Sequence, residues 1–382
     1  MTHIEAIHTR IIDLPTVRGH VLAMATLTVQ SVVIVEIRFS DGSKGIGEGT
    51  AIGGLSYGAE SPESIASAVD TYIAPAIARM DAGNVNAARH AMERAVRGNP
   101  IARSAVECAL WDGLGRRLGL PVSALMGGAV RSGLECAWTL ASGDGGTDIE
   151  EAREMLGLRR HRQFKLKIGK RGVREDLAHV GRIAAALPAE AVLTVDVNQA
   201  WDLHDARWGL RGLQEIGVGM VEQPVPAGRV ADLAALARGY EIAVMADEGL
   251  AGPEDALRHA GARAADAFAI KVAKSGGLGP ARDAAAIGQA AGLGLYAGTM
   301  LESGVGTAAA LQLFCTLPHL RWGSELFGPL LMRADILETP LTYADFQVHL
   351  PAGPGSGVDV DVDRVAFHER GAPRLQPVSA HG

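Results

Sequence analysis

The feature of this sequence that most restricts its fold is a regular alternation of short apolar segments and longer amphipathic ones beyond Cys136. Such alternation is typical of strand–helix units that build a buried parallel sheet. Eight candidate strands share this spacing; they are ECAWTLAS, FKLKIG, AVLTVDVN, GMVEQPV, IAVMADE, FAIKVAK, LGLYAGTM and RWGSEL. Eight units favour a closed α/β barrel of the TIM type over an open doubly wound sheet, which is the alternative.

The sequence before the barrel predicts a domain of mixed strands and helices. The run from Ser31 to Ile46, SVVIVEIRFSDGSKGI, predicts two strands joined at Asp41-Gly42, which is a strong hairpin signal. Alanine-rich helical patterning follows over about 61–118, with Pro62 near a helix start and Gly119 near a helix stop. We therefore expect an α+β domain here.

The chain length also predicts more than one structural part. At 382 residues the chain exceeds the size that one hydrophobic core usually supports. The predicted parts are an α+β capping domain over 1–130, a catalytic barrel over 131–328 and a C-terminal segment over 329–382. We expect the turn-rich third part to pack back onto the capping domain and its last residues to fray.

Composition argues against several classes of protein. The net charge of −7 disfavours a nucleic-acid-binding surface, and no window offers the roughly 18 uncharged apolar residues of a membrane-spanning helix. The N-terminus lacks a basic start followed by a long apolar stretch, so we expect no export signal. Three widely spaced cysteines, Cys108, Cys136 and Cys315, cannot complete a disulfide framework. We expect a cytoplasmic protein without nucleic-acid or membrane partners.

Polar residues recur near the carboxyl ends of five neighbouring candidate strands. Along the chain they are Lys165 and Lys167, Asp196 and Asn198, Glu222, Asp247 and Glu248, and Lys271 and Lys274. The intervals from Asp196 through Glu222 and Asp247 to Lys271 are 26, 25 and 24 residues, close to one strand–helix unit. Because the carboxyl ends of barrel strands meet at one mouth, where active sites lie, we expect these side chains to converge.

Three of these residues predict a metal site. Asp196, Glu222 and Asp247 would repel one another in an apolar barrel unless a cation lay between them. Oxygen donors without His or Cys suit Mg²⁺ or Mn²⁺, which would keep positions open for a substrate carboxylate. For any single acid, the alternative is a strand-end residue that caps the next helix.

The lysines predict proton transfer. Lys165 and Lys167 are two residues apart, so both should point into the barrel, although a solvated pair at the sheet edge is the alternative. Mutual repulsion and a nearby dication would lower a lysine pKa toward neutrality. Lys271 would face the pair across a substrate. A metal that binds a carboxylate, flanked by lysines that move a proton at the α-carbon, suits a reaction through an enolate.

At these positions the sequence resembles a known family. The runs FKLKIG, VDVNQAW, VEQPV, MADEGL and IKVAKSGG resemble the muconate lactonizing subgroup of the enolase superfamily. The likeness continues through DLPTVRGHVLAM, AIGGLSYGAESPE, AWTLASGD, YAGTMLES and SELFGPLL, so it covers nearly the whole chain. It implies a modified barrel of (β/α)7β form beneath an α+β capping domain. It also implies that the distal carboxylate of cis,cis-muconate adds to a double bond and the resulting enolate is protonated to muconolactone.

The resemblance further implies a role for each charged residue. The ligands of Mn²⁺ or Mg²⁺ would be Asp196, Glu222 and Asp247. Lys167 would donate the proton and Lys165 would assist electrostatically. Lys271 would lie opposite, for substrate binding or the reverse proton transfer, and Glu325 would lie near the substrate carboxylate. The partner would be a small dicarboxylate, and the chain would form a homo-oligomer, an octamer in this family.

Two loops of the capping domain resemble the family's lid over the barrel mouth. They cover residues 21–27 and 51–60, and they would set specificity and exclude water. The expected substrate contacts are Ile52 and Tyr57 from the lid and Asn198 and Thr299 from the barrel. For the apolar lid positions, simple packing against the barrel is the alternative.

The branch of the subgroup is left open by the sequence. The lid text IGGLSYG and Glu302 resemble enzymes for unchlorinated muconate, whereas Ala310–Leu313 resembles the chloromuconate branch. Ser275 stands where the commonest muconate enzymes have asparagine.

Two rival functions remain from the sequence alone. One is another activity of the superfamily, such as N-acylamino acid racemase, dipeptide epimerase or o-succinylbenzoate synthase, which would share the metal and lysine sites. The lid and the SELFGP run argue against it. The other is a non-catalytic barrel that binds small carboxylates, against which the intact acids and lysines argue.

Overall fold

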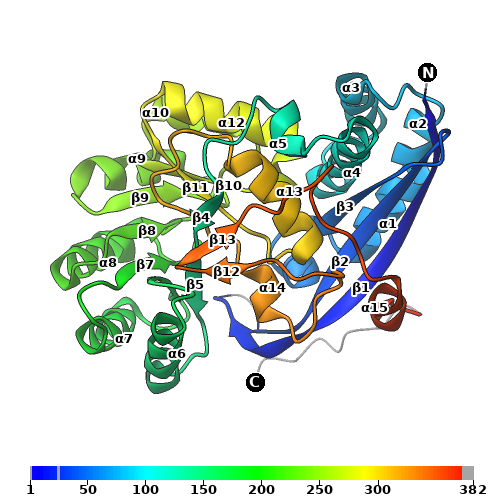
Figure 1. The fold of residues 1–382 in the computed structure, drawn as a ribbon. Coiled ribbons are helices and arrows are strands. Elements are labelled where there is room, and N and C mark those ends of the chain that lie inside the picture. The colour runs from blue at the N-terminus through cyan, green and yellow to red at the C-terminus, as the bar shows by residue number, and fades with distance from the viewer. Residues whose placement is uncertain (1, 24–25, 372–382) are drawn as a thin grey trace.

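The centre of the molecule is a parallel sheet, seen in a computed structural model that describes residues 2–23 and 26–371. Its strands follow one another in space in the order of the sequence (Figure 1). They are β5 (Ala137–Leu140), β6 (Gln163–Lys167), β7 (Val192–Asp196), β8 (Met220–Glu222), β9 (Ala243–Ala246), β10 (Ala267–Ile270) and β11 (Gly294–Ala297). These strands are largely buried, as expected for parallel strands covered on both faces.

The eighth apolar segment closes this sheet into a barrel. Ser324 forms parallel bridges with Ala297 of β11 and with Cys136, which immediately precedes β5. Ala137 N donates to Ser324 O at 2.7 Å, and Glu325 N donates to Ala297 O at 2.8 Å. The predicted (β/α)7β barrel is thus confirmed, and the open sheet is excluded.

Helices connect consecutive strands around the outside of the barrel (Figure 1). They are α6 (Gly145–Gly157), α7 (Val173–Ala186), α8 (Leu203–Ile216), α9 (Val230–Gly239), α10 (Pro253–Ala262), α12 (Leu278–Ala290) and α13 (Gly304–Phe314). Local sequence sets their ends. In α8, for example, the Asp202 carboxylate accepts Asp205 N at the start, and Gly217 adopts a left-handed conformation (φ 91°) after the end.

The sixth candidate strand is shorter than the sequence predicted. The run FAIKVAK was expected to be extended throughout, but β10 ends at Ile270 and the short helix α11 (Val272–Ser275) follows. Lys271 caps this helix, and its carbonyl accepts Ser275 N at 3.0 Å. Gly276 then ends the helix at φ 93°. The continuous apolar run hid this change because apolar residues suit both a buried strand and a buried helix.

The capping domain begins with an antiparallel sheet in the order β1 (Ile4–Val21), β2 (Thr26–Phe39) and β3 (Lys44–Thr50). The predicted hairpin at Asp41-Gly42 joins β2 to β3 and is confirmed. The long strand β1 was not predicted individually. Its pairing with β2 shifts register between Pro15 and His20, and this irregularity interrupts the alternation that marks a strand.

Helices of the capping domain follow the sheet. They are η1 (Gly54–Ser56), α1 (Pro62–Ala68), η2 (Val69–Ile73), α2 (Ala74–Ile77), α3 (Val85–Ala95), α4 (Pro100–Leu118) and α5 (Val122–Leu125). The predicted start is confirmed, since Ser61 caps α1 in a capping box with Ser64 and Pro62 opens the helix. The predicted stop is confirmed as well, because Gly119 is left-handed (φ 67°) after α4.

Two glycines let α4 lie directly on β3. A Cβ atom at Gly45 would lie 2.1 Å from Ala109 O, and one at Gly47 would lie 2.0 Å from Ala105 O. No side chain fits at these distances, so glycine permits the close contact between helix and strand.

The C-terminal segment contributes small elements to both parts of the molecule. It contains α14 (Gly328–Leu331), β12 (Tyr343–Ala344), β13 (Gln347–His349) and α15 (Val362–His368), and β13 pairs with β4 (Gly133–Glu135). Its apolar side chains cover one face of β1 and β2. The cluster includes Ile12, Leu14, Val32 and Ile34 from the sheet and Met332, Ile336, Leu337 and Val365 from the C-terminal segment.

The three cysteines form no disulfide in the described part of the chain. Cys108, Cys136 and Cys315 are free and buried. Across residues 2–23 and 26–371, no helix has the length and apolar character needed to cross a membrane.

Candidate active site

The charged residues expected at strand ends do meet at one mouth of the barrel. Lys167, Asp196 and Glu222 are the last residues of β6, β7 and β8. Lys167 pairs with Asp196 in the strand register, and Asp196 pairs with Glu222. Asp247 and Lys271 immediately follow β9 and β10. Each of these residues ends its strand or directly follows it. Their regular spacing in the sequence therefore places them together at the carboxyl ends of the barrel strands.

Lysine side chains form ion pairs with two of the three predicted metal ligands, Asp196 and Asp247. Lys167 Nζ lies 2.6 Å from Asp196 Oδ2. Lys271 Nζ lies 2.7 Å from Asp247 Oδ2, and Lys274 Nζ lies 3.1 Å from Asp247 Oδ1. Both carboxylates are buried, so these ion pairs are shielded from solvent.

Glu325 joins the third predicted ligand through Lys165. The fully buried Lys165 ammonium donates to both Glu222 and Glu325, and Thr139 Oγ1 donates to Glu325 Oε1 at 2.7 Å. Burial alone would raise the pKa of Glu325, but the charges of Lys165 and Lys167 outweigh burial and lower this pKa to about 2. Glu325 is therefore an ionised partner that fixes Lys165.

The sequence predicted that mutual repulsion and a nearby dication would lower a lysine pKa; among the protein's own groups, the shifts of the lysine pKa values are in the opposite direction. Burial lowers the pKa of Lys167, but Asp196 and Glu325 outweigh burial and raise it. The pKa of Lys165 rises well above its usual range in the same way, against burial, because of Glu222 and Glu325. The carboxylates outweigh the repulsion between the two ammonium groups. The protein's own groups thus favour the charged form of both lysines, the form in which Lys167 can donate a proton.

Acidic groups nevertheless outnumber the lysines at this mouth. Asn198 Nδ2 donates to Asp196 Oδ2 at 3.0 Å and to Glu248 Oε1 at 3.1 Å. Glu248 Oε2 is buried without a hydrogen-bond partner in the described part of the chain. Burial, with the charges of Asp247 and Asp196, raises the pKa of Glu248 to about 7. Five carboxyl groups thus share the site with four ammonium groups; they are Asp196, Glu222, Asp247, Glu248 and Glu325 against Lys165, Lys167, Lys271 and Lys274.

This donor set fits a hard divalent cation in its chemistry. Within residues 2–23 and 26–371, no three His, Cys, Asp or Glu side chains are arranged around a common metal position. Each of the three predicted ligands instead lies at ion-pair distance from a lysine ammonium group. The buried, oxygen-only set has one carboxyl group more than it has ammonium groups and an unpartnered oxygen on Glu248, and such oxygens suit a hard dication as ligands.

A small cavity of about 20 Å³ lies among these groups, beneath the predicted lid. Its walls come from the capping domain and the barrel and comprise His20, Leu22, Ile52, Tyr57, Lys167, Asn198, Lys271, Thr299, Leu301 and Glu325. All four side chains expected to contact substrate are in this lining. The Tyr57 hydroxyl lies 3.0 Å from both Asp247 Oδ2 and Lys271 Nζ, so the second lid loop reaches the acids. Two positions of the first lid loop, Met24 and Ala25, lie outside the described residues.

His20 lines the same cavity, although the sequence had assigned it no role. Its side chain is buried, and burial, followed by the charges of Lys167 and Arg18, lowers its pKa to about 3. Its Nδ1 atom has no hydrogen-bond partner among the described residues. The available signal was a polar ring between Gly19 and Val21, directly before the first lid loop. Its position over the cavity depends on the docking of the capping domain.

Two carboxylates, those of Glu302 and Glu48, fix the loop that carries Thr299. Thr299 Oγ1 donates to Glu302, whose carboxylate also accepts Met300 N at 3.0 Å. Next in the chain, Ser303 N donates to Glu48 Oε1 at 2.8 Å, and Ser303 Oγ donates to Glu48 Oε2 at 2.6 Å. Because Glu48 is on β3, the capping domain fixes the loop after β11 that lines the cavity.

Two features that the sequence had singled out lie outside the cavity lining. Ser275 is buried at the end of α11. The run Ala310–Leu313 is buried within α13, where Gln312 Oε1 accepts Ser123 N and Gln312 Nε2 donates to Ser356 O, both at 3.0 Å. This run therefore acts on the site only through packing.

Comparison with known proteins places both parts of the chain in one family. Residues 6–127 match the family described as mandelate racemase / muconate lactonizing enzyme, N-terminal domain, and residues 147–365 match the enolase C-terminal domain-like family. A muconate cycloisomerase of Acinetobacter lwoffii is 49% identical over 95% of this chain and 94% of its own. A chloromuconate cycloisomerase of Cupriavidus necator is 44% identical over 97% of this chain and 100% of its own.

A solved structure agrees with these matches. The crystal structure of muconate lactonizing enzyme from Pseudomonas fluorescens, complexed with muconolactone, has a TM-score of 0.96 and 50% identity. It covers 97% of this chain and 100% of its own. The resemblance expected from the motifs is confirmed over nearly the full length. The enzymes of the mandelate racemase / muconate lactonizing enzyme family depend on a divalent metal. The chain belongs to the muconate lactonizing subgroup of the enolase superfamily.

Proposed function

We propose that this chain is a muconate cycloisomerase, which interconverts cis,cis-muconate and muconolactone in the degradation of aromatic compounds. The observation that carries the proposal is the cavity that Lys167 and Lys271 both line, each paired with a buried strand-end acid. A relative with this activity in its name is 49% identical over 95% of the chain. Chloromuconate is a second candidate substrate, supported by the 44% identical relative and by the run Ala310–Leu313.

Each catalytic group has a proposed task in ring closure. Asp196, Glu222 and Asp247 are the proposed ligands of Mn²⁺ or Mg²⁺, which would supply positive charge toward the substrate carboxylate. Lys167, protonated at the cavity wall, delivers a proton to the α-carbon when the distal carboxylate closes the ring. Lys165, held by Glu325, maintains positive charge near the substrate carboxylate that the metal would bind. Lys271 binds the substrate from the opposite side, and in the reverse direction Lys167 takes back the proton that it delivered.

The lid residues and the polar residues of the barrel have a proposed role in binding. Ile52 and Tyr57 cover the substrate and exclude water, which strengthens the electrostatic interactions inside. Asn198 and Thr299 orient its polar groups.

The test is a substrate panel. The protein would be incubated with Mn²⁺ and cis,cis-muconate, chloromuconates or N-acylamino acids, and loss of the diene absorbance would be followed for the muconates. A muconate cycloisomerase removes the absorbance, with the higher kcat/KM identifying the preferred muconate. A racemase leaves the absorbance unchanged and changes the optical rotation of an N-acylamino acid. A barrel that only binds carboxylates turns over nothing on the panel.

The metal assignment is tested by removal and substitution. We expect chelation to abolish turnover and Mn²⁺ or Mg²⁺ to restore it, the better ion being the one that restores more. Asp196→Asn should lose Mn²⁺ binding and activity together, whereas Asp232→Asn, on the surface of α9, should change neither. Activity that survives chelation would exclude the proposed site.

We also propose that the chain works in the cytoplasm as a homo-oligomer, an octamer by resemblance to its subgroup. Light scattering of the purified protein would measure the number of chains, and a monomer would contradict the proposal.

A further inference from the structure

A buried arginine near the end of the described chain connects segments that flank the lid. Arg370 follows α15, and its backbone N donates to Ile11 O on β1 at 2.8 Å. Its side chain is only 5% exposed. A buried guanidinium requires partners for its donors, so the positions of these partners show what the arginine holds together.

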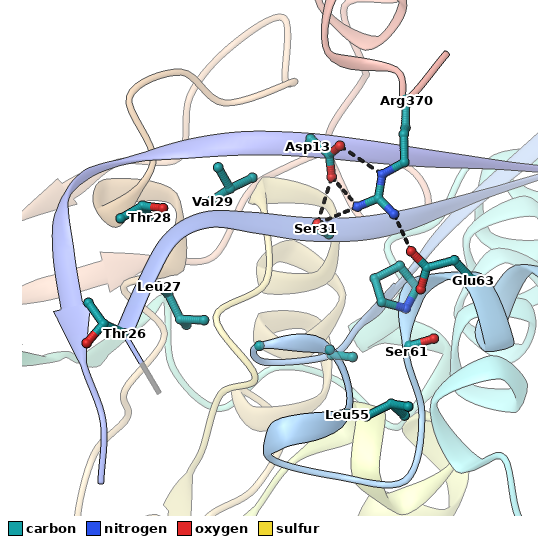
Figure 2. Close-up of a pocket in the computed structure, with 14 residues that line it drawn as sticks. Asp13, Thr26, Leu27, Thr28, Val29, Ser31, Leu55, Ser61, Glu63 and Arg370 are labelled. Carbon is teal, nitrogen blue, oxygen red and sulfur yellow. Dashed lines mark hydrogen bonds and ion pairs between the residues drawn. The ribbon is translucent and has the colours of Figure 1, made fainter. Parts of the chain in front are cut away.

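Three segments supply the partners (Figure 2). Arg370 Nε lies 2.8 Å from Asp13 Oδ2, and Nη2 lies 2.5 Å from Asp13 Oδ1, in a bidentate pair. Nη2 also donates to Ser31 Oγ at 2.8 Å, and Nη1 donates to Glu63. A bidentate pair fixes the plane of the guanidinium, so the donor toward Glu63 has a fixed direction.

Two of the partners lie on the strands that flank the first lid loop, and the third directly follows the second lid loop. Asp13 is on β1 and Ser31 on β2, the strands that flank the loop over 21–27. Glu63 is in the first turn of α1, directly after the loop over 51–60. One side chain therefore joins the start of α1 to the two strands.

A groove of about 610 Å³ separates the second lid loop from these strands (Figure 2). Gly53, Gly54 and Leu55 line one side, and residues 26–29 line the other. Leu55 is 67% exposed, and both glycines have left-handed backbones (φ 60° and 62°). The outer side of the loop therefore has little packing support, and the loop is held by its ends and by the contacts of Tyr57 with Asp247 and Lys271 on its inner side. Ile52, in the same loop, faces the catalytic cavity.

We propose that Arg370 is a positioning residue: through Glu63 it holds the base of loop 51–60 against β1 and β2, and so fixes Ile52 and Tyr57 over the cavity. The kinetic consequence rests on the proposed function. The structural consequence, slower opening of loop 51–60, does not.

The test compares two changes in this contact with two matched controls. Glu63→Gln removes the negative charge that Arg370 pairs with at the lid base, and Arg370→Lys keeps the charge but loses the bidentate geometry. Glu254→Gln is the control for Glu63, since Glu254 also follows a proline in the first turn of a helix, α10. Arg364→Ala is the control for Arg370, since Arg364 lies on α15 and bonds Leu337 O instead of the lid.

Two readouts separate positioning from general stability. We expect Glu63→Gln and Arg370→Lys to raise KM for cis,cis-muconate roughly two- to fivefold, the effect of an ion pair whose carboxylate is 54% exposed, with a smaller change in kcat. Amide hydrogen exchange in residues 51–60 should accelerate while that of the barrel strands stays unchanged. The controls should change neither readout.

The proposal is overturned if Glu63→Gln leaves KM and exchange in 51–60 at wild-type values, even when Arg370→Lys lowers the melting temperature. That result would make Arg370 a purely structural residue. Because exchange is measured without substrate, it decides the matter even if wild type does not act on muconate.

Discussion

Lys167 illustrates at the scale of one residue how neighbouring charge sets chemistry. Its ammonium lies 2.6 Å from Asp196 Oδ2, and its pKa is raised against burial by Asp196 and Glu325. We expect Lys167→Ala to lower kcat by about 10²–10⁴, the usual contribution of a general acid. Mn²⁺ binding should be largely kept, because the acids remain. Turnover and Mn²⁺ titration on one preparation would check this, and turnover near the wild-type rate would assign the proton to another donor.

His20 permits a test of pH dependence at a single residue. Its folded-state pKa of about 3 lies below the ordinary value of 6.5, chiefly because of burial, so the unfolded chain binds this proton more readily. The stability that the neutral ring contributes is therefore present above about pH 6.5 and lost as pH falls toward 3. We expect the NMR signals of the His20 ring not to titrate between pH 5 and 8. A midpoint near 6.5 would contradict its burial against Lys167.

At the scale of elements, a glutamate on a strand of the capping domain caps a helix of the barrel. Glu48 on β3 accepts hydrogen bonds from Ser303 N and Gly306 N at the start of α13, each at 2.8 Å. This cap also fixes the loop that carries Thr299 into the cavity. Burial raises the pKa of Glu48 to about 7, from an ordinary value of 4.5.

This cap predicts how stability changes with pH. The folded state binds the Glu48 proton more tightly than the unfolded state, so the associated stability is full below about pH 4.5 and lost as pH rises to 7. The change is on the order of 3 kcal/mol. We expect Glu48→Gln to flatten the dependence of melting temperature on pH between 5 and 8, while Glu154→Gln, on the surface of α6, leaves it unchanged. An unaltered slope in Glu48→Gln would assign the dependence to other groups.

At the scale of the whole molecule, the C-terminal segment covers a face of the first sheet. Removing residues 329–382 would expose buried side chains of β1 and β2, namely Ile12, Leu14, Val32 and Ile34. Each contributes about 1.5–3 kcal/mol when buried, and together they form an apolar patch. We expect a chain of residues 1–328 to aggregate or to lose cooperative unfolding. Size-exclusion chromatography and thermal scans would check this, and a soluble, cooperative fragment would show that the cover is dispensable.

The spacing of residues along the sequence by itself determined the barrel and the convergence of charged side chains at its mouth. Asp196, Glu222 and Asp247 recur at intervals of one strand–helix unit, and each lies at or just after the end of its strand. The hairpin at Asp41-Gly42 and the helix end at Gly119 could also be predicted from the sequence, because turn and cap conformations depend on local residue type.

Only the tertiary structure decided which charges meet and what protonation state follows. Lys165 is 160 residues from Glu325 in sequence, and the pKa of Lys165 depends on the distance between them in space. His20 enters the cavity because the capping domain docks on the barrel. Local patterns specify turns, strands and their periods, whereas electrostatic interactions act between atoms that packing brings together, so the site's chemistry emerges only when the chain is folded.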